Sequence, residues 1–310
     1  MPDQNAGRQR VKVLLLGAAG QLGRCVQDAL RDGPAQLVPL TRHDLDLTDP
    51  AQLRAAFDQH RPDMVINAAA YNAVDRAEVE AESAHRVNAQ GPGRLAELCL
   101  HTDTDLIHFS TDYVFDGQPL TGPAPYKEQA APHPLSVYGA SKLAGEQVVL
   151  ASACRVTMIR TSWLFSEYGT NFVKTMLRLA NAAEPIHVVT DQRGCPTYAG
   201  DLAQVVKRLV AWDPSVAGPR PTGLFHYAGN SVLSWYDFAQ AIVASADAHG
   251  LLRQRPTLVP IKAAEFQSPA LRPAYSALDS SLLTQQLGVP ASDWQRALLL
   301  VLARLKADGR

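Results

Sequence analysis

The chain has 310 residues, of which 46% are hydrophobic and 19% are charged, a composition typical of a globular domain. A net charge of −1 gives no reason to expect nucleic acid or an anionic membrane as a partner. No apolar run is long enough to span a bilayer. Residues 1–10 are polar and lack the apolar centre of a secretory signal, so they predict a flexible extension. Four separated cysteines without a CxxC pair disfavour zinc and disulfides and favour a reducing cytoplasm.

Short apolar runs alternate with helical patterns through the first half of the chain. The apolar runs predict strands at 11–17, 36–40, 63–70, 105–111 and 155–162. The helical patterns fall at about 21–30, 49–60, 83–100 and 136–152. Asp49 and Pro50 are typical of the cap and first position of a helix. This alternation predicts an α/β fold, a Rossmann-like doubly wound parallel sheet with right-handed crossovers.

The regular alternation ends at residue 162. Later patterns predict helices at 171–180, 234–248 and 292–305, a strand at 223–229 and a mostly irregular, proline-rich stretch at 253–275. We expect a smaller C-terminal α/β lobe over the carboxyl ends of the sheet strands. The division that follows is a Rossmann domain of 11–162 with parts of 186–228, and a substrate lobe of 163–185 and 229–310.

Three glycines follow the first predicted strand directly, in the stretch GAAGQLG. Gly17, Gly20 and Gly23 permit a tight turn and a close approach of the backbone to a pyrophosphate, and Gln21 and Leu22 open the following helix. The N-terminus of that helix offers free N–H groups and the positive end of its dipole. A plain strand–helix turn is the alternative, but the position near the start of the chain favours dinucleotide binding.

The second predicted strand ends in LTRHDLDLTD. An acidic residue at this tip would bind the ribose 2′-hydroxyl of NAD, but Arg42 stands here and can pair with a 2′-phosphate. The arginine therefore favours NADPH, with NADH as the alternative cofactor. The alternative for Arg42 itself is a solvated surface arginine without a ligand. Asp46 and Leu47 are expected to flank the adenine.

Small and hydroxyl-bearing residues end the third and fourth predicted strands. Ala68, Ala69 and Ala70 leave room for a cofactor against the sheet edge, although helix–sheet packing would also require small side chains. Ser110 and Thr111 place hydroxyls at a carboxyl end of the sheet, where ligands bind in open α/β folds. A turn-forming Ser/Thr/Asp cluster is the alternative for these two.

Tyr138 and Lys142 are one helical turn apart in VYGASKLAGE, so both project from one face. The ammonium of Lys142 can hold the nicotinamide ribose hydroxyls, and its charge is expected to lower the pKa of Tyr138. Tyr138 can give a proton to a carbonyl oxygen during reduction, while Thr111 holds that oxygen. A YxxxK pair alone is common, but one downstream of a glycine fingerprint and a strand-end Ser-Thr indicates carbonyl reduction with a nicotinamide cofactor.

Several stretches resemble one family in detail. They are GAAGQLG, NAAAYNAVDRAE (67–78), HFSTDYVFDG, PLSVYGASKLAGE, RTSWLF (160–165), NFVKTMLRLA and DQRGCPT (191–197), and they cover nearly the whole chain past residue 10. The chain is thereby similar to the dTDP-4-dehydrorhamnose reductase family of the extended short-chain dehydrogenase/reductases. The resemblance implies a cytoplasmic enzyme that reduces the 4-keto group of dTDP-4-dehydro-beta-L-rhamnose with NADPH, acting as a monomer or weak homodimer.

The resemblance also implies roles for individual residues. It implies a catalytic set of Thr111, Tyr138 and Lys142, and a substrate site of Val74, Thr111, Asp112, Trp163 and Arg272. Trp163 would lie against a sugar or base ring, with a core aromatic as the alternative, and Arg272 would pair with the diphosphate. Two other functions stay open: a non-catalytic NADP-binding regulatory subunit of a methionine adenosyltransferase, and another nucleotide-sugar reductase or epimerase.

The chain departs from the family pattern at two places. Tyr71 and Asn72 stand where the family usually has His-Thr, which affects the substrate or nicotinamide pocket. Some members carry an acidic residue two positions after the last fingerprint glycine and use it in a metal-bridged dimer, but here that residue is Cys25. Magnesium is therefore left open, and no metal ligand is predicted.

Overall fold

The structure is a computed structural model that describes residues 10–118, 124–182 and 184–308. Of the predicted extension at 1–10, only residue 10 is among them; the rest lies outside the described residues. Within the described part of the chain, no helix has both the length and the apolar character needed to cross a bilayer.

A six-stranded parallel sheet forms the centre of the larger domain, in the order β2-β1-β3-β4-β5-β10. Its strands are β1 (Lys12–Leu16), β2 (Gln36–Leu40), β3 (Met64–Asn67), β4 (Asp105–Thr111), β5 (Val156–Thr161) and β10 (Gly223–His226). The chain places β2 on one side of β1 and then crosses over to place β3 on the other. The strand order therefore reverses between β1 and β3, where ligands bind in doubly wound folds.

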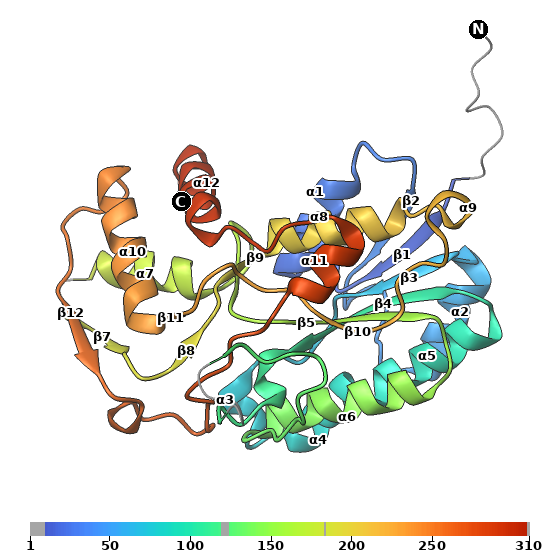
Figure 1. Cartoon of the computed structure of the whole chain (residues 1–310), viewed down its shortest axis with the longest axis horizontal. Helices are drawn as coiled ribbons and strands as arrows, with labels where there is room; N and C mark the ends of the chain where they lie inside the picture. Colours follow the sequence, from blue (N-terminus) through green and yellow to red (C-terminus); the bar gives the residue numbers. More distant parts are fainter. Residues whose placement is uncertain (1–9, 119–123, 183, 309–310) are drawn as a thin grey trace, which may run out of the picture.

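Helices cover both faces of this sheet (Figure 1). One face carries α1 (Gln21–Leu30), α8 (Ala199–Val210) and α11 (Ser281–Leu287), and the other carries α2 (Pro50–His60), α5 (Gly91–His101) and α6 (Val137–Ala151). Alternate residues of β1 enter the two cores, with Val13 and Leu15 on the α1 side and Leu14 and Leu16 on the α2 side. The predicted α/β class, a doubly wound parallel sheet, is confirmed.

Side-chain caps set the start of two of these helices. Asp49 accepts hydrogen bonds from the backbone of Ala51 and Gln52, and Pro50 takes the first position of α2, as predicted. Ser136 caps α6 by accepting from the Gly139 N–H at 3.2 Å. These caps explain why the sequence located both helix starts to within a residue.

The single helix predicted at 83–100 is interrupted. It consists of α4 (Ala81–His85), a π-helical turn, η1 (Arg86–Gln90), and α5. Asn88 lies in this turn, and its amide donates to the Tyr71 carbonyl at 3.0 Å and to the Ser141 hydroxyl at 3.0 Å. The turn therefore ties α6, which carries the Tyr–Lys pair, to the segment after β3.

The smaller lobe packs three helices on short strand pairs (Figure 1). The helices are α7 (Phe172–Ala180), α10 (Trp235–Ala248) and α12 (Trp294–Ala307). The strand pairs are β7 (Ile186–Val189) with β12 (Leu258–Ile261), β8 (Arg193–Gly194) with β11 (Leu233–Ser234), and β6 (Leu164–Phe165) with β9 (Thr197–Tyr198). The other short elements are α3 (Val74–Ala77), α9 (Pro214–Ala217), η2 (Asp112–Val114) and η3 (Ala263–Glu265).

The stretch 253–275 is mostly irregular, as predicted, with β12 forming there and pairing with β7. One later segment lies elsewhere than the sequence predicts. Helix α11, expected in the lobe, instead buries Leu283 and Leu287 in the core between the sheet and α8. We therefore propose a domain division in which 199–226 and α11 join the sheet domain and β7 joins the lobe.

Candidate active site

A cavity of about 350 Å³ opens at the carboxyl ends of the strands, where the order reverses between β1 and β3. It collects most of the predicted site residues from separate elements. Those lining it are Gly20, Gln21, Leu22, Ala68, Ala69, Ala70, Thr111, Asp112, Tyr138, Lys142 and Trp163. Those outside the lining are Gly17, Gly23, Arg42, Asp46, Leu47, Val74 and Arg272. The grouping brings the predicted catalytic set and the glycine turn to one place.

The glycine turn holds the backbone of β1, β3 and α1 together closely. Gly17 has φ +74°, and a Cβ there would lie 2.6 Å from the Ala68 carbonyl carbon. A Cβ on Gly23 would lie 2.3 Å from the Gly17 oxygen. Gly20 is the N-cap of α1 and offers no capping side chain, so the first N–H groups of the helix have no side-chain cap. Gly20, Gln21 and Leu22 line the cavity. This backbone suits an anionic group such as a pyrophosphate.

The residues after β2 divide between surface and core. Arg42 is exposed, and its charge interacts with Asp46. The carboxylate of Asp46 accepts from the Thr48 N–H at 2.8 Å, and this hydrogen bond lowers its pKa. Leu47 is 5% exposed and belongs to the core under the sheet, where it packs against Gly91. Arg42 therefore remains a candidate for a 2′-phosphate, while Leu47 already has a packing role.

Tyr138, Lys142 and Thr111 converge from α6 and the end of β4. The hydroxyl of Tyr138 shares a side-chain hydrogen bond with Thr111. Thr111 also donates to Asp112 Oδ1 at 3.1 Å and accepts from the Tyr113 N–H. Lys142 Nζ donates to the Phe109 carbonyl at 2.7 Å. A phenol, a threonine hydroxyl and a buried amine thus line one cavity.

Burial dominates the electrostatics of this pair. It raises the pKa of Tyr138 to about 12, with the Thr111 hydrogen bond opposing the rise and Asp112 adding to it. It lowers the pKa of Lys142 to about 8, and the carboxylate of Glu146 opposes that fall. The expectation that Lys142 lowers the pKa of Tyr138 is therefore wrong for this structure, because desolvation of the phenolate is the largest cause of the shift and the charge of Lys142 is not among its causes. The phenol stays protonated through the neutral range.

An ion pair buried behind α6 was not predicted. Glu146, one turn after Lys142, accepts from Arg160 Nε at 2.8 Å and Nη2 at 2.5 Å, and both side chains are 3% exposed or less. Arg160 Nη1 lies 3.4 Å from His226 Nε2, and its guanidinium lies over the Phe115 ring. The pair joins α6 to β5 and β10, so it fixes the helix that carries Tyr138 and Lys142.

Several buried polar atoms at the cavity have no hydrogen-bond partner among the described residues. They include Ser110 Oγ, Asp112 Oδ2 and Thr161 Oγ1, and all three residues line the cavity. Burial raises the pKa of Asp112 to about 7, although hydrogen bonds with Ser276 and Thr111 oppose the rise. Because buried polar groups are normally paired, these atoms suit a polar ligand.

A loop of the lobe is hydrogen-bonded to Gln21, the first residue of α1. Asn171 donates to Gln21 Oε1 at 2.8 Å, Ser166 donates to the same atom at 3.1 Å, and Gln21 Nε2 donates to the Thr170 carbonyl. Thr170 and Asn171 also line the cavity, with Asn67, Ser162 and Leu164. Sequence reasoning missed this contact because about 150 residues separate its two sides.

Two of the predicted substrate residues lie outside the cavity lining. Arg272 pairs with Asp75 at 2.9 Å and shares a side-chain hydrogen bond with Tyr113. Val74 precedes Asp75 at the start of α3. At the first departure from the family pattern, Asn72 lines the cavity, whereas the Tyr71 hydroxyl donates to Glu80 Oε2 at 2.6 Å.

The surroundings of Cys25 do not fit a magnesium ion. Burial raises the pKa of its thiol to about 12, so it is no anionic ligand at neutral pH. The neighbouring Glu167 carboxylate already pairs with Arg304 and accepts from the Tyr198 hydroxyl. No group of three or more His, Cys, Asp and Glu side chains in the described ranges is arranged for a metal. We assign no chemical step to magnesium.

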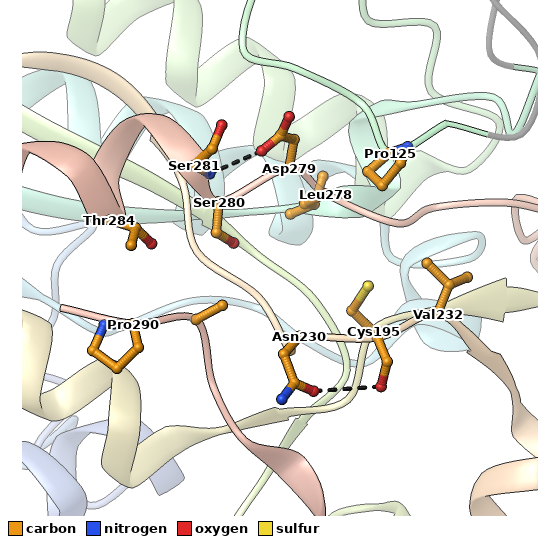
Figure 2. A pocket seen from close by; sticks show the side chains of 13 residues that line it. Pro125, Cys195, Asn230, Val232, Leu278, Asp279, Ser280, Ser281, Thr284 and Pro290 are labelled. Atoms are coloured by element: carbon orange, nitrogen blue, oxygen red, sulfur yellow. Dashed lines mark hydrogen bonds between the residues drawn. The ribbon is translucent and has the colours of Figure 1, made fainter.

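A second cavity, of about 480 Å³, lies beside the start of α11 (Figure 2). Its wall includes Cys195, Asn230, Ser280 and Thr284, and it shares no lining residue with the first cavity. Ser280 Oγ already accepts from the Ala228 N–H at 2.8 Å. Because Tyr138 and its partners are absent from this wall, the chemistry belongs to the first cavity.

The fold and the site define a Rossmann-type protein of the short-chain dehydrogenase/reductase kind. The defining features are a parallel sheet whose strand order reverses, a glycine turn before an uncapped helix N-terminus, and a Tyr–Lys pair at the same cavity. Comparison with known proteins narrows this class. Residues 11–307 match the family model described as RmlD substrate binding domain. The chain therefore belongs to the dTDP-4-dehydrorhamnose reductase family.

Individual relatives cover nearly the full chain. It is 43% identical to a dTDP-4-dehydrorhamnose reductase of Aggregatibacter actinomycetemcomitans, over 93% of this chain and 97% of the relative. It is 41% identical to a probable dTDP-4,6-dihydroxy-2-methyloxan-3-one 4-ketoreductase of Streptomyces antibioticus, over 92% of each chain. A crystal structure of dTDP-4-dehydrorhamnose reductase from Bacillus anthracis in complex with NADP superposes with a TM-score of 0.86 at 34% identity, covering 96% of this chain and 100% of that one.

Proposed function

We propose that the protein is an NADPH-dependent dTDP-4-dehydrorhamnose reductase, which reduces the 4-keto group of dTDP-4-dehydro-beta-L-rhamnose to give dTDP-L-rhamnose. The observation that carries this proposal is the meeting of Thr111, Tyr138 and Lys142 in the cavity beside the glycine turn. The names of the relatives support the same reaction class, reduction of a ketone on a dTDP-sugar.

The residues present fit a dinucleotide. The unshielded N-terminus of α1 at Gly20 would hold the pyrophosphate, and exposed Arg42 would pair with the 2′-phosphate. Ala68, Ala69 and Ala70 leave a flat wall at the end of β3, and Lys142 lies within reach of the same cavity for the nicotinamide ribose. NADPH, when bound, supplies the hydride. NADH remains the alternative donor.

The side chains of the chain itself manage the proton. Tyr138 is protonated at neutral pH because burial raises its pKa to about 12, and it gives its proton to the keto oxygen as the carbon is reduced. An alkoxide is far more basic than a phenolate, so this transfer is favourable despite the high pKa. Thr111, hydrogen-bonded to Tyr138, holds the same oxygen in place.

The nucleotide sugar would occupy the side of the cavity away from the glycine turn. Trp163 and Asp112 already line it, and Val74 and Arg272 would contact the substrate from its rim. Arg272 must exchange its bond with Asp75 for the diphosphate. We further propose a cytoplasmic monomer or weak homodimer; the four free thiols support a reducing compartment.

Purified protein, NADPH and dTDP-4-dehydro-beta-L-rhamnose test the proposal. NADPH oxidation, followed by absorbance, should depend on the keto-sugar, and NMR should identify dTDP-L-rhamnose as the product. Absence of oxidation while NADPH binding is demonstrated by fluorescence titration would contradict the proposal.

A second candidate is reduction of a related dTDP-keto sugar. The Streptomyces antibioticus relative, 41% identical, carries the name of a ketoreductase for a different dTDP-linked ketone. Asn72, at a family departure, lines the cavity and offers an amide that could select another sugar. Comparing kcat/KM for dTDP-4-dehydro-beta-L-rhamnose and for dTDP-4,6-dihydroxy-2-methyloxan-3-one separates the two candidates.

A further inference from the structure

Trp163 has a backbone conformation that large side chains rarely adopt. Its φ is +45°, in the left-handed region, and the residue lies between β5 and β6, two residues after β5 ends. Such a conformation persists only when the surroundings hold it, and it is concentrated at functional sites. The contacts of Trp163 therefore show what holds it.

The indole of Trp163 is stacked on that of Trp235. Their ring centroids lie 3.5 Å apart with planes 5° from parallel, and Phe172 packs against Trp235 from α7 with centroids 4.6 Å apart. The Trp163 carbonyl accepts from the Thr197 N–H at 3.2 Å. One face of the Trp163 ring is thus covered by the lobe, while the residue still lines the cavity.

Gly194 of β8 also lies close to this indole. A Cβ at this position would lie 2.6 Å from Trp163 Cε2 and 2.7 Å from Nε1, so a side chain here would force the indole to move. Gly194 pairs with Leu233 in the β8–β11 ladder, and Trp235 begins α10 two residues later. Ser234 caps this helix with a capping box that includes Asp237. One short ladder therefore sets both neighbours of the indole.

We propose that Gly194 and Trp235 are positioning residues that hold the Trp163 indole as a rigid aromatic wall for the nucleotide sugar. The inference deepens the proposed function and rests on it, since that function supplies the ligand. A ring already fixed by stacking loses little conformational freedom when a sugar or base packs against it. The lobe thereby contributes to substrate affinity through residues that need not touch the substrate.

Two variants test the positioning role. In Gly194→Ala the new methyl group displaces the indole, and in Trp235→Leu the stacking partner is lost. Each should raise KM for dTDP-4-dehydro-beta-L-rhamnose about tenfold, equivalent to 1.4 kcal/mol, while NADPH Kd stays within about twofold. Trp235→Phe keeps an aromatic face and should restore KM to within about threefold of wild type.

Matched controls lie away from the cavity. Gly33→Ala adds a methyl group whose nearest neighbour is the Leu30 carbonyl at 3.2 Å, and Trp212→Phe removes an indole that bonds the Gly218 carbonyl. Both should leave KM unchanged. The fluorescence emission of Trp163 is obtained by subtracting the spectrum of Trp163→Phe. Its emission maximum should shift in Gly194→Ala and Trp235→Leu and stay unchanged in both controls.

The outcomes separate the two proposals. If Trp235→Leu has the same KM as wild type and its Trp163 emission is not shifted, the positioning role is overturned, even though the enzyme is an active reductase. This test does not require Gly194→Ala to fold. A wild-type protein without reductase activity refutes the proposed function. In that case the positioning role is tested by the quenching of Trp163 emission on addition of dTDP-L-rhamnose. The role is overturned if wild type shows no quenching. It is also overturned if wild type and Trp235→Leu are quenched equally.

Discussion

The two halves of the cavity are built on different principles. The cofactor half, where we propose that NADPH binds, depends on backbone: behind its lining, Gly17 and Gly23 bring β1, β3 and α1 together at distances that no side chain would permit. The substrate half, where we propose that the sugar binds, depends on side chains from distant segments, and its Trp163 is held by Gly194 and Trp235. The first half is therefore fixed by local backbone sterics, and the second by side-chain packing within the lobe.

The difference suggests where each half can vary. A backbone site that binds phosphates through a helix N-terminus tolerates few changes and recognises a feature common to all dinucleotides. A side-chain wall held by a separate lobe can change its ligand without disturbing the sheet. Relatives with different named dTDP-ketone substrates at about 40% identity are consistent with this arrangement.

The largest expected effect on stability concerns the buried Glu146–Arg160 pair, which anchors α6, the helix that carries Tyr138 and Lys142. Glu146→Gln leaves Arg160 buried without its partner and should lower the free energy of unfolding by about 3 to 5 kcal/mol, measured by urea denaturation. Asp103→Asn removes one partner of the exposed pair with Arg155 and should cost less than about 1 kcal/mol. Equal losses in the two variants would show that the buried pair does not anchor α6.

The next effect tests the backbone half directly. Gly17→Ala and Gly288→Ala both place a methyl group at a positive φ, +74° and +65°, but of these two only Gly17 has neighbours within 4 Å. Gly17→Ala should destabilise by roughly 2 to 4 kcal/mol and weaken NADPH binding. Gly288, in the left-handed conformation after α11, should cost only about 1 kcal/mol when replaced by alanine, with binding unchanged. Similar unfolding curves for both would mean that the close approach of Ala68 is unimportant.

An effect that appears only as the pH changes is expected at Asp112, which lines the cavity. Burial raises its pKa from 3.8 to about 7, so between these values the folded chain keeps a proton that the unfolded chain has released. The contribution of Asp112 to stability therefore falls as pH rises through this window. Asp112→Asn removes this titration, so the unfolding free energy of the variant should gain up to about 4 kcal/mol on that of wild type between pH 4 and pH 8, at 1.36 kcal/mol for each pKa unit.

Urea denaturation of wild type and Asp112→Asn at pH 4 and pH 8 measures this difference. A difference in unfolding free energy that does not change with pH would show that the folded-state pKa of Asp112 is not raised.

The sequence was sufficient where the signal is local. The spacing of Gly17, Gly20 and Gly23 after an apolar run predicted the turn, and the one-turn separation of Tyr138 and Lys142 predicted their shared face. The cap Asp49 marked the start of a helix because a side chain caps backbone close to it in the chain. Each of these features depends on residues close together in the chain.

The sequence was insufficient where partners are distant. Nothing in VYGASKLAGE shows that Glu146 pairs with Arg160 on another strand, nor that α11 turns back onto the sheet. Burial is equally hidden, which is why the direction of the Tyr138 pKa shift was mistaken. Trp163 was identified as a substrate residue by resemblance, but the stack with Trp235 is visible only in three dimensions.

Steady-state kinetics of Tyr138→Phe test the central claim most directly, since the variant removes only the hydroxyl that gives the proton. With dTDP-4-dehydro-beta-L-rhamnose and NADPH, kcat should fall by about 10²- to 10⁴-fold, while NADPH Kd stays within about twofold of wild type. A variant that turns over the keto-sugar at the wild-type rate would contradict the assignment of Tyr138 as the proton donor.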